Sequence, residues 1–194
     1  MTYTGDITIY IVQPNIENDY SIVNGNFDCS HCRNITTLKG SPKVVNGNYD
    51  CCVCDSIETL EGSPEIVNGK FDCSCCNNIE TLDGAPKVVV SKFNCSWCNS
   101  LKSLKGAPKI VEGEFDCHWC ENLETVEGAP KKCKIFDCRK CTKLKNLDPL
   151  LLCDIEEVKA DKHLLEDYYK KKAAVEKYGY DKAMEIFEVM ENLL

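Results

Sequence analysis

The stretch NGKFDCSCCNNIETLDGAPKVV, residues 68–89, recurs with small changes from residue 24 to about residue 147. The shared phrase is N-G-x-F-D-C-x-x-C-x-x-I-x-T-L-x-G-[SA]-P-x-x-V, and it is 22 residues long. Its aromatic residue recurs every 22 positions until the last step, which is 21: Phe27, Tyr49, Phe71, Phe93, Phe115 and Phe136. Self-similarity at such a period is the signature of a solenoid, in which each unit buries its apolar surface against the next.

Each unit contains one predicted strand between two predicted turns. Asn-Gly is typical of a tight turn with a positive φ, and the x-F-D-C-x that follows has the composition of a short strand. Because side chains alternate along a strand, the aromatic residue and the first cysteine should face the core while Asp72 faces away. After the Gly-Ala-Pro turn, residues 88–89 should return along the far wall. The predicted core positions of this unit are Phe71, Cys73, Ile79 and Leu82.

The segments outside the repeats predict end caps, which solenoids need because an end unit otherwise exposes its core and its strand edge. Residues 7–12, ITIYIV, are mostly β-branched or aromatic and predict a hairpin or a single strand over the first repeat. Counting 22 residues from Phe136 reaches Val158, so residues 155–161 predict a seventh, degenerate strand.

Two helices should follow that strand. Asp161 is a typical N-cap for a helix from 162 to about 178, which Gly179 would end, and Asp181 can start a second helix to Leu194. The apolar residues of the second helix follow helical spacing. The sequence therefore predicts an α/β solenoid of six to seven 22-residue units with a short parallel sheet. Its parts are an N-terminal β cap (1–23), the repeats (24–153), and a last degenerate strand with a two-helix cap (154–194).

The 194-residue chain has a formal net charge of −8 at pH 7. This balance argues against general nucleic-acid binding, which neutralises phosphates with Lys and Arg, and against binding to an anionic membrane. Residues 1–12 do not combine a basic start with a long apolar run, and no stretch approaches the roughly 18 apolar residues of a membrane span. We therefore expect a cytoplasmic protein whose thiols stay reduced.

The columns F-x-C-x-x-C-x-x-[IL] resemble the strand segment of leucine-rich repeats, L-x-L-x-x-[NC]-x-L. They are similar to the cysteine-containing subtype and to short repeats of tailed-phage and large-virus proteins, built on phrases such as FDCSxNxLTSLEGAPKEVGG. The resemblance covers about residues 22–147, with Cys in place of the phage-type Asn and a unit that is one residue longer. It implies a leucine-rich-repeat-like recognition scaffold without enzymatic activity, and a viral protein that acts on a factor in the host cytoplasm.

Of the sixteen cysteines, twelve form two columns of the repeat, which begin at Cys29 and Cys32. One interpretation is a buried ladder of free thiols, because Cys behaves as a small hydrophobe whose S–H can contact the neighbouring backbone. Zinc held by adjacent C-x-x-C pairs and stacked disulfides are the alternatives. Strands about 4.8 Å apart do not match the roughly 3.8 Å between the sulfurs of a zinc site. A reducing cytosol opposes disulfides. We therefore favour free thiols and expect no metal or cofactor.

The other four cysteines are Cys52, Cys75, Cys133 and Cys153. The first two should face outward and be the more reactive thiols. If the ladder did bind zinc, the alternative function would be a metal-stabilised structural or virion-assembly protein that unfolds on chelation.

The outward side of the strands carries a column of acidic residues. Its members are Asp28, Asp50, Asp72, Asn94, Asp116 and Asp137. Like charges on neighbouring strands repel, so each carboxylate should be solvated or hydrogen-bonded to a nearby Ser or Asn side chain. The functional alternative is an acidic strip, interrupted at Asn94, that attracts a basic partner or cations.

Trp97 and Trp119 occupy the same column in adjacent units and are the only tryptophans of the chain. The repeat does not require Trp there, since the other units have His, Val, Cys or Lys. Adjacent exposed aromatic residues are typical binding hot spots. Alternatively, the rings fold over the edge of the solenoid and pack on the caps. His118 could add a pH-sensitive contact. The predicted partner-binding residues are Trp97, Trp119, His118, Asp72, Asp116, Asn94 and Lys92.

Known catalytic patterns such as G-x-S-x-G, a phosphate loop, H-E-x-x-H and G-x-G-x-x-G do not occur in the sequence. Cys117 and His118 are neighbours on a predicted strand and so point to opposite faces, which prevents them from acting as a dyad. We therefore expect a protein that is not an enzyme, has no catalytic residues, and binds a protein partner on the inner face of its sheet. Its oligomeric state is left open.

Overall fold

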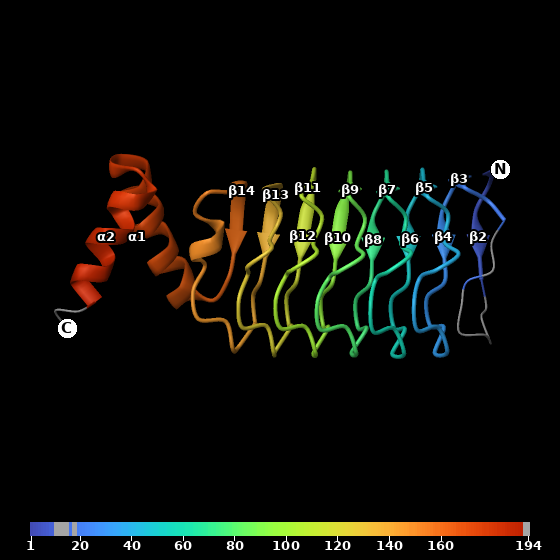
Figure 1. The fold of residues 1–194 in the computed structure, drawn as a ribbon, viewed down its shortest axis with the longest axis horizontal. Coiled ribbons are helices and arrows are strands. Elements are labelled where there is room, and N and C mark those ends of the chain that lie inside the picture. Colours follow the sequence, from blue (N-terminus) through green and yellow to red (C-terminus); the bar gives the residue numbers. More distant parts are fainter. Residues whose placement is uncertain (10–15, 17–18, 192–194) are drawn as a thin grey trace.

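The structure, a computed structural model, describes residues 1–9, 16 and 19–191. It is a parallel β-solenoid of about seven turns with a helical region at the C-terminal end. The coils follow one another in a nearly straight row, and equivalent residues of the repeats lie 22 positions apart (Figure 1). The predicted solenoid and its period are therefore confirmed.

Each coil contributes two short strands, and each strand pairs with its equivalents in the adjacent coils. The odd-numbered ladder consists of β1 (Thr2–Thr4), β3 (Ile22–Asn24), β5 (Val44–Val45), β7 (Ile66–Val67), β9 (Val88–Val89) and β11 (Ile110–Val111). The even-numbered ladder consists of β2 (Ile7–Thr8), β4 (Phe27–Asp28), β6 (Tyr49–Asp50), β8 (Phe71–Asp72), β10 (Lys92–Asn94) and β12 (Glu114–Asp116). Every pair is parallel and in register; Phe71, for example, lies opposite Phe93.

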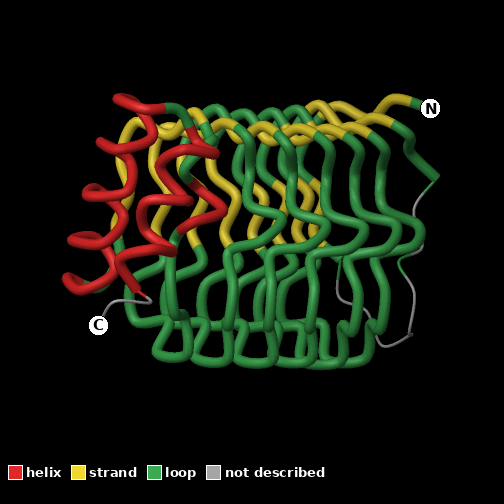
Figure 2. The backbone as a smooth tube through the Cα atoms, turned by 60° about the vertical axis from the view of Figure 1, so that its left-hand side comes forward, coloured by secondary structure: helices red, strands yellow, loops and turns green. Residues whose placement is uncertain are grey.

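The odd-numbered ladder corrects the prediction that residues 88–89 return along a far wall. Only two residues connect β9 to β10, so the two strands adjoin at a corner. Figure 2 shows the strands on adjoining sides of the coils and the loops on the remaining side. The sequence pattern did not predict a separate strand at this corner, because a Val-Val pair is equally compatible with a far wall of the core.

Glycine at the corner between the two strands is required by close approach and not by its backbone angle. A Cβ on Gly47 would lie 2.5 Å from the carbonyl oxygen of Gly25, and one on Gly69 would lie 2.5 Å from that of Gly47. These glycines have no positive φ, so the predicted positive-φ turn at Asn-Gly is wrong. Positive φ occurs instead at the glycine before the proline turn, for example 89° at Gly62.

The last two coils lack the corner. β13 (Lys132–Asp137) and β14 (Asp154–Lys159) are continuous six-residue strands, and β13 belongs to both ladders. The residue missing from the sixth unit is therefore the one that forms the corner elsewhere. Phe136 lies opposite Val158 in this pair, which confirms the predicted seventh strand.

The core consists of columns that run the length of the solenoid. The aromatic rings stack with centroids 5.2 to 5.4 Å apart and interplanar angles of 4° to 9°. The two cysteine columns and the Ile and Leu columns are buried with them. All four predicted core positions of the unit, Phe71, Cys73, Ile79 and Leu82, have no exposed surface.

The N-terminal residues continue the solenoid. β1 pairs in parallel with β3, and β2 pairs in parallel with β4, so that Ile7 lies opposite Phe27. A hairpin would be antiparallel, so the described residues before the repeats form a further coil and not the predicted hairpin. Residues 10–12 of the predicted strand lie outside the described residues.

Two helices lie beyond β14 (Figure 1). α1 spans Lys162–Tyr178 and ends at Gly179, which has a φ of 80°, as predicted. The Asp161 side chain does not cap α1; it accepts a hydrogen bond from the backbone N–H of Lys140. α2 spans Tyr180–Glu191 and so begins one residue before the predicted start. The predicted end at Leu194 lies outside the described residues.

A buried lysine of α1 forms an ion pair that joins this helix to the last coil. The ammonium group of Lys171 on α1 contacts Asp148 at 3.0 Å and Asp167 at 3.1 Å. Asp148 begins a short 3-10 helix, Asp148–Leu150, that precedes β14. Leu164 and Tyr168 of α1 are buried in the same core cluster as Val158 of β14. Neither described helix is long and apolar enough to cross a membrane.

Candidate interaction site at the tryptophan turns

In each of the six repeats a turn follows the strand of the even-numbered ladder, which is β4, β6, β8, β10, β12 or β13. In this turn the residue before the second cysteine has a positive φ. These residues have φ between 56° and 63°: His31, Val53, Cys75, Trp97, Trp119 and Lys140. A left-handed backbone costs a residue other than glycine roughly 1–2 kcal/mol. The turn is held by the neighbouring coil, because the N–H of Trp97, for example, donates to the carbonyl of His118 at 3.0 Å. Neither glycine nor asparagine marks this position, so the pattern did not predict the turn.

The two tryptophans therefore lie on turns and not on the face of the sheet. β10 ends at Asn94 and β12 ends at Asp116, three residues before each tryptophan. The predicted location on the inner strand face is wrong, because the strands are shorter than the C-x-x-C pattern suggested. The two residues nevertheless stay in one column, since adjacent coils are in register.

The tryptophan rings stack on each other at the surface. Their centroids are 4.7 Å apart with an interplanar angle of 8°, and Trp97 is 42% exposed. The ammonium group of Lys140 lies 6.0 Å from the centre of the Trp119 ring, within reach of a cation–π interaction. The His118 ring meets Trp97 edge-on at 6.4 Å. We call these four residues the tryptophan patch: Trp97, Trp119, His118 and Lys140.

Lys140 is the member of the patch that sequence reasoning missed. It occupies the column of Trp97 and Trp119 in the next coil, and that shared column is the signal that could have identified it. Its side chain is exposed and extends the stack beyond Trp119.

The acidic column is more buried than the sequence suggested. Asp72, Asn94 and Asp116 are 6%, 8% and 4% exposed. Each member of the column accepts a hydrogen bond from the backbone N–H two residues later, at 2.9 to 3.2 Å. The donors are Ser30, Cys52, Ser74, Ser96, His118 and Arg139. Of the two expected states, solvated or hydrogen-bonded to a nearby Ser or Asn side chain, the first is wrong for the buried members, which include Asp137 at 2% exposed, and the second is confirmed for Asp72, which accepts a hydrogen bond from Asn94.

Asp116 lies beside the tryptophan patch and organises its neighbours. Its carboxylate accepts hydrogen bonds from Lys92 Nζ at 2.6 Å and contacts His118 Nδ1 at 2.5 Å. Burial alone raises the pKa of the Asp116 carboxyl, but the hydrogen bonds from Lys92 and His118 outweigh it and hold the pKa below its ordinary value. Lys92 also pairs with Glu114 at 3.0 Å, so its charge is compensated twice. This cluster orients His118 against Trp97.

Asp72, two coils before Asp116 in the acidic column, is also held by a lysine and by hydrogen bonds. Lys70 pairs with its carboxylate, and Asn94 Nδ2 donates to it at 3.0 Å. Burial raises the pKa of the Asp72 carboxyl, but the hydrogen bonds from Lys70 and Ser74 lower it by a larger amount. The pKa is therefore below the ordinary value. Asn94 therefore acts as a neutral donor between two acidic coils and is not a gap in a charged strip.

Basic side chains compensate the C-terminal part of the acidic column. Asp137 is held by Arg139, with Nη2 2.6 Å from Oδ2, as Asp72 and Asp116 are by Lys70 and Lys92. Within the described part of the chain, Asp28 and Asp50 take part in no ion pair. Within this column, the carboxylates without an ion pair thus lie in the first two repeats, away from the tryptophans.

The cysteine columns use their thiols to satisfy the backbone. Each second cysteine from the second repeat onward donates S–H to the carbonyl of the first cysteine in the preceding coil, at 3.1 to 3.3 Å. This matches the prediction that Cys takes the place of Asn in contacting the neighbouring backbone. Burial raises the pKa of the first-column thiols of Cys51 and Cys95 well above the ordinary value, so they are protonated at neutral pH. The donating thiols are Cys54, Cys76, Cys98, Cys120 and Cys141.

All sixteen cysteines are free. Among the residues that the structure describes, no group of three or more His, Cys, Asp or Glu side chains is arranged to hold a metal ion. Cys52 and Cys75 are half-buried, and burial raises the pKa of both thiols. The structure thus gives neither of them the lowered pKa that marks a reactive cysteine.

Comparison of the chain with family models, curated proteins and solved structures finds no match.

Proposed function

We propose that this protein is a non-enzymatic recognition scaffold that binds a protein partner through the tryptophan patch. The observation that carries the proposal is the stacked Trp97–Trp119 pair on left-handed turns at the surface, in which Trp97 is exposed and Trp119 is half-buried. Trp and Tyr are the residues that most often dominate the binding energy of protein interfaces.

The fold does not explain the two tryptophans. The same turn is formed by His31, Val53 and Cys75 in earlier coils with nearly the same φ. A large aromatic residue gains nothing in backbone energy at such a position, where glycine or asparagine would be favoured. Because all six repeats share this backbone angle, only the choice of an aromatic side chain at two of the six positions calls for a functional explanation.

The other predicted site residues have supporting roles in this proposal. Asp116 and Lys92 fix His118 beside Trp97, and none of their charges is free to pair with a partner without breaking a hydrogen bond. Asp72 and Asn94 belong to the preceding part of the same buried row. Lys140 supplies the accessible positive charge, so we expect an acidic or acceptor group on the partner beside its apolar contact.

The resemblance of the repeats to those of phage and large-virus proteins supports a viral origin and a partner from the host cytoplasm. The alternative of a zinc-stabilised structural protein is less well supported, because thiols of the second cysteine column donate to backbone carbonyls.

Native mass spectrometry of the full chain, purified gently from its own cells under reducing conditions, tests the proposal. We expect the wild-type protein to carry the added mass of a different polypeptide. The double variant Trp97→Asn, Trp119→Asn should lose that mass, because asparagine accepts the left-handed turn but removes both rings.

Val53→Asn is the matched control, since it changes the same turn position two coils away. It should retain the partner, and circular dichroism should show the fold in all variants. Retention of the same polypeptide by the double variant would contradict the proposal, as would a wild-type protein that carries no second polypeptide.

A further inference from the structure

The stack of the tryptophan patch has one open face. The coil before Trp97 has Cys75 at the position of the tryptophans, and this side chain is too short to cover an indole ring. Among the described residues, no ring is stacked on this face of Trp97 and no cation lies over it. Trp119, in contrast, is stacked on Trp97 and approached by Lys140 from the next coil. Trp97 is accordingly 42% exposed, whereas Trp119 is half-buried.

The short side chains of this column continue for a second coil. Val53 precedes Cys75, and both are half-buried on turns with nearly the same φ as Trp97. Inter-coil hydrogen bonds keep the column in register; the N–H of Cys75, for example, donates to the carbonyl of Ser96 at 2.9 Å. Trp119 stacks on Trp97 at one coil step, 4.7 Å. A planar group placed over Cys75 would therefore lie at stacking distance from the free face of Trp97. We call this space, over Cys75 and Val53, the Cys75 step.

A carboxylate without an ion pair borders the Cys75 step. The side-chain amide of Asn77 donates to Asp55 Oδ1 at 3.2 Å and to the Cys75 carbonyl at 3.4 Å, so one amide group joins the Asp55 carboxylate to the Cys75 backbone. Burial raises the pKa of the Cys75 thiol, and the nearby carboxylates of Asp72 and Asp55 raise it further. Asp72 is paired with Lys70. Asp55 is exposed and, within the described part of the chain, takes part in no ion pair.

Arginine is the side chain whose chemistry matches this space. Its guanidinium group is planar and cationic, so it stacks on the face of a tryptophan ring while its N–H groups remain free to donate to a carboxylate. A lysine ammonium could pair with Asp55 but has no plane to lay on the ring. A nucleic-acid base could stack on Trp97, but its phosphates would meet the Asp55 carboxylate and a chain with a net charge of −8.

We propose that an arginine side chain of the partner protein occupies the Cys75 step, stacked on the free face of Trp97 and paired with Asp55. The inference rests on the proposed function and adds the chemistry of the contact. Lys140 lies at the other end of the same stack, beside Trp119. The partner segment should therefore carry an arginine at one end of the tryptophan patch and an acidic or acceptor group at the other, which fixes its direction along the solenoid.

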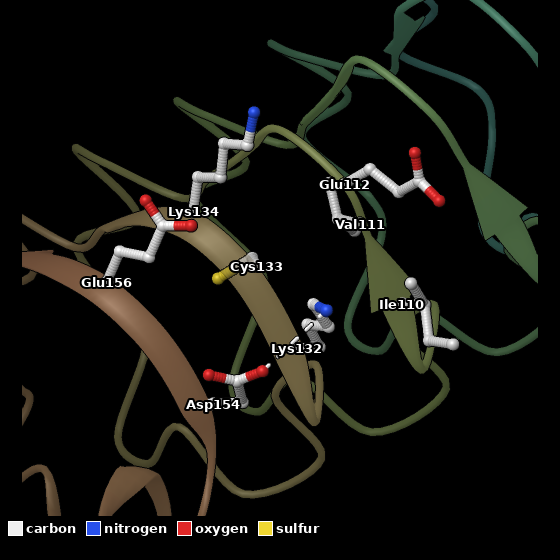
Figure 3. A pocket seen from close by; sticks show the side chains of 8 residues that line it. All are labelled: Ile110, Val111, Glu112, Lys132, Cys133, Lys134, Asp154 and Glu156. Atoms are coloured by element: carbon white, nitrogen blue, oxygen red, sulfur yellow. Dashed lines mark ion pairs between the residues drawn. The ribbon is translucent and has the colours of Figure 1, made fainter.

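A second group of surface carboxylates is less suited to arginine. A cavity of about 470 Å³ beside β11, β13 and β14 has Glu112, Asp154 and Glu156 in its lining. Figure 3 shows Lys132 and Lys134 among these side chains, and Lys132 pairs with Asp154 at 3.8 Å. An arginine that entered this cavity would meet two ammonium groups and no aromatic ring. The cavity thus lacks both features that select arginine at the Cys75 step.

Two fluorescein-labelled peptides of equal charge, hexa-arginine and hexa-lysine, test the proposal by fluorescence anisotropy with the full chain under reducing conditions. We expect the wild-type protein to bind hexa-arginine about tenfold more tightly than hexa-lysine at the same salt concentration, because only the guanidinium group stacks on the ring. Unlabelled hexa-arginine should also change the tryptophan emission. That emission reports this site alone, since Trp97 and Trp119 are the only tryptophans of the chain.

Two variants change the site in different ways, and circular dichroism should show the fold in both. Cys75→Tyr places a ring over the free face of Trp97 and should abolish the preference for arginine; the same turn already carries aromatic residues in two other coils. Asp55→Asn removes the carboxylate and should weaken the binding of hexa-arginine severalfold. Glu188→Gln is the matched control for the charge, because Glu188 is exposed on α2 and pairs with no basic side chain among the described residues. It should bind both peptides as the wild type does.

Equal affinity for the two peptides would overturn the proposal, and so would a preference for arginine that Cys75→Tyr and Asp55→Asn leave unchanged. Native mass spectra of the same variants separate this failure from a failure of the proposed function. A polypeptide that the double tryptophan variant loses but Cys75→Tyr retains would support the tryptophan patch as an interface and exclude the Cys75 step from it.

Discussion

Two aromatic stacks run along this solenoid, and they differ in what surrounds them. Phe71, Phe93 and Phe115 stack at 5.2 to 5.3 Å with no exposed surface. Trp97 and Trp119 stack at 4.7 Å on the surface, with Trp97 42% exposed. Stacking itself follows from the repeat, since any two equal residues 22 positions apart become neighbours. It is burial, and not stacking, that separates a structural column from a candidate interface.

Truncation of a core ring should have the largest effect. Phe93→Ala leaves a cavity between Phe71 and Phe115, and we expect a loss of about 3–5 kcal/mol in the free energy of unfolding. Urea denaturation followed by circular dichroism measures it. Phe93→Leu should cost less than Phe93→Ala because it fills part of the cavity. A loss below that of Trp97→Ala would reverse the assignment of the two stacks.

Removal of a ladder thiol should have the next largest effect. Cys98 donates to the Cys73 carbonyl at 3.2 Å, so Cys98→Ala leaves that carbonyl without a donor and removes buried volume. We expect a loss of roughly 2 kcal/mol, within the range for an unsatisfied buried group. Cys98→Ser retains a donor and should lose less. If the alanine and serine variants unfolded at the same urea concentration, the thiol would act by packing alone.

The carboxylate beneath the tryptophan patch should give a smaller, pH-dependent effect. The folded pKa of Asp116 is below the unfolded value of about 3.9, so its ionised form stabilises the protein above that pH. The stabilisation disappears as the pH falls through the folded pKa. We therefore expect Asp116→Asn to cost roughly 1–2 kcal/mol at pH 7, and the difference from wild type to shrink below about pH 4.

Urea midpoints measured at pH 7 and pH 3 test this dependence. Glu58→Gln is the control, because Glu58 is exposed and pairs with no basic side chain among the described residues. A difference between Asp116→Asn and wild type that stays constant across this range would show that the carboxylate is not the source of the stability.

The 22-residue period was sufficient to predict the core but not the turns. Phe71, Cys73, Ile79 and Leu82 recur in the other repeats with few exceptions. Alternation along the strand predicts that Phe71 and Cys73 point into the core, and the repeat extends this prediction to every coil. The positive φ at Trp97 could not be predicted in this way, because inter-coil hydrogen bonds impose it on whichever residue stands there. The ion pairs of the acidic column could not be predicted from the repeat either, because Lys92 pairs with Asp116 of the next coil whereas the equivalent Lys70 pairs with Asp72 of its own coil.

The smallest effect on stability should come from the tryptophans, and it sharpens the comparison most. Trp97→Asn removes a stacked ring but relieves a left-handed backbone that costs other residues roughly 1–2 kcal/mol. The two contributions oppose each other, so we expect a change of less than about 1 kcal/mol in either direction, measured by urea denaturation. A loss as large as that of Phe93→Ala would mean that the surface stack is structural. In that case the exposed edge of Trp97 would be a by-product of packing, and the partner would have to be sought on another face.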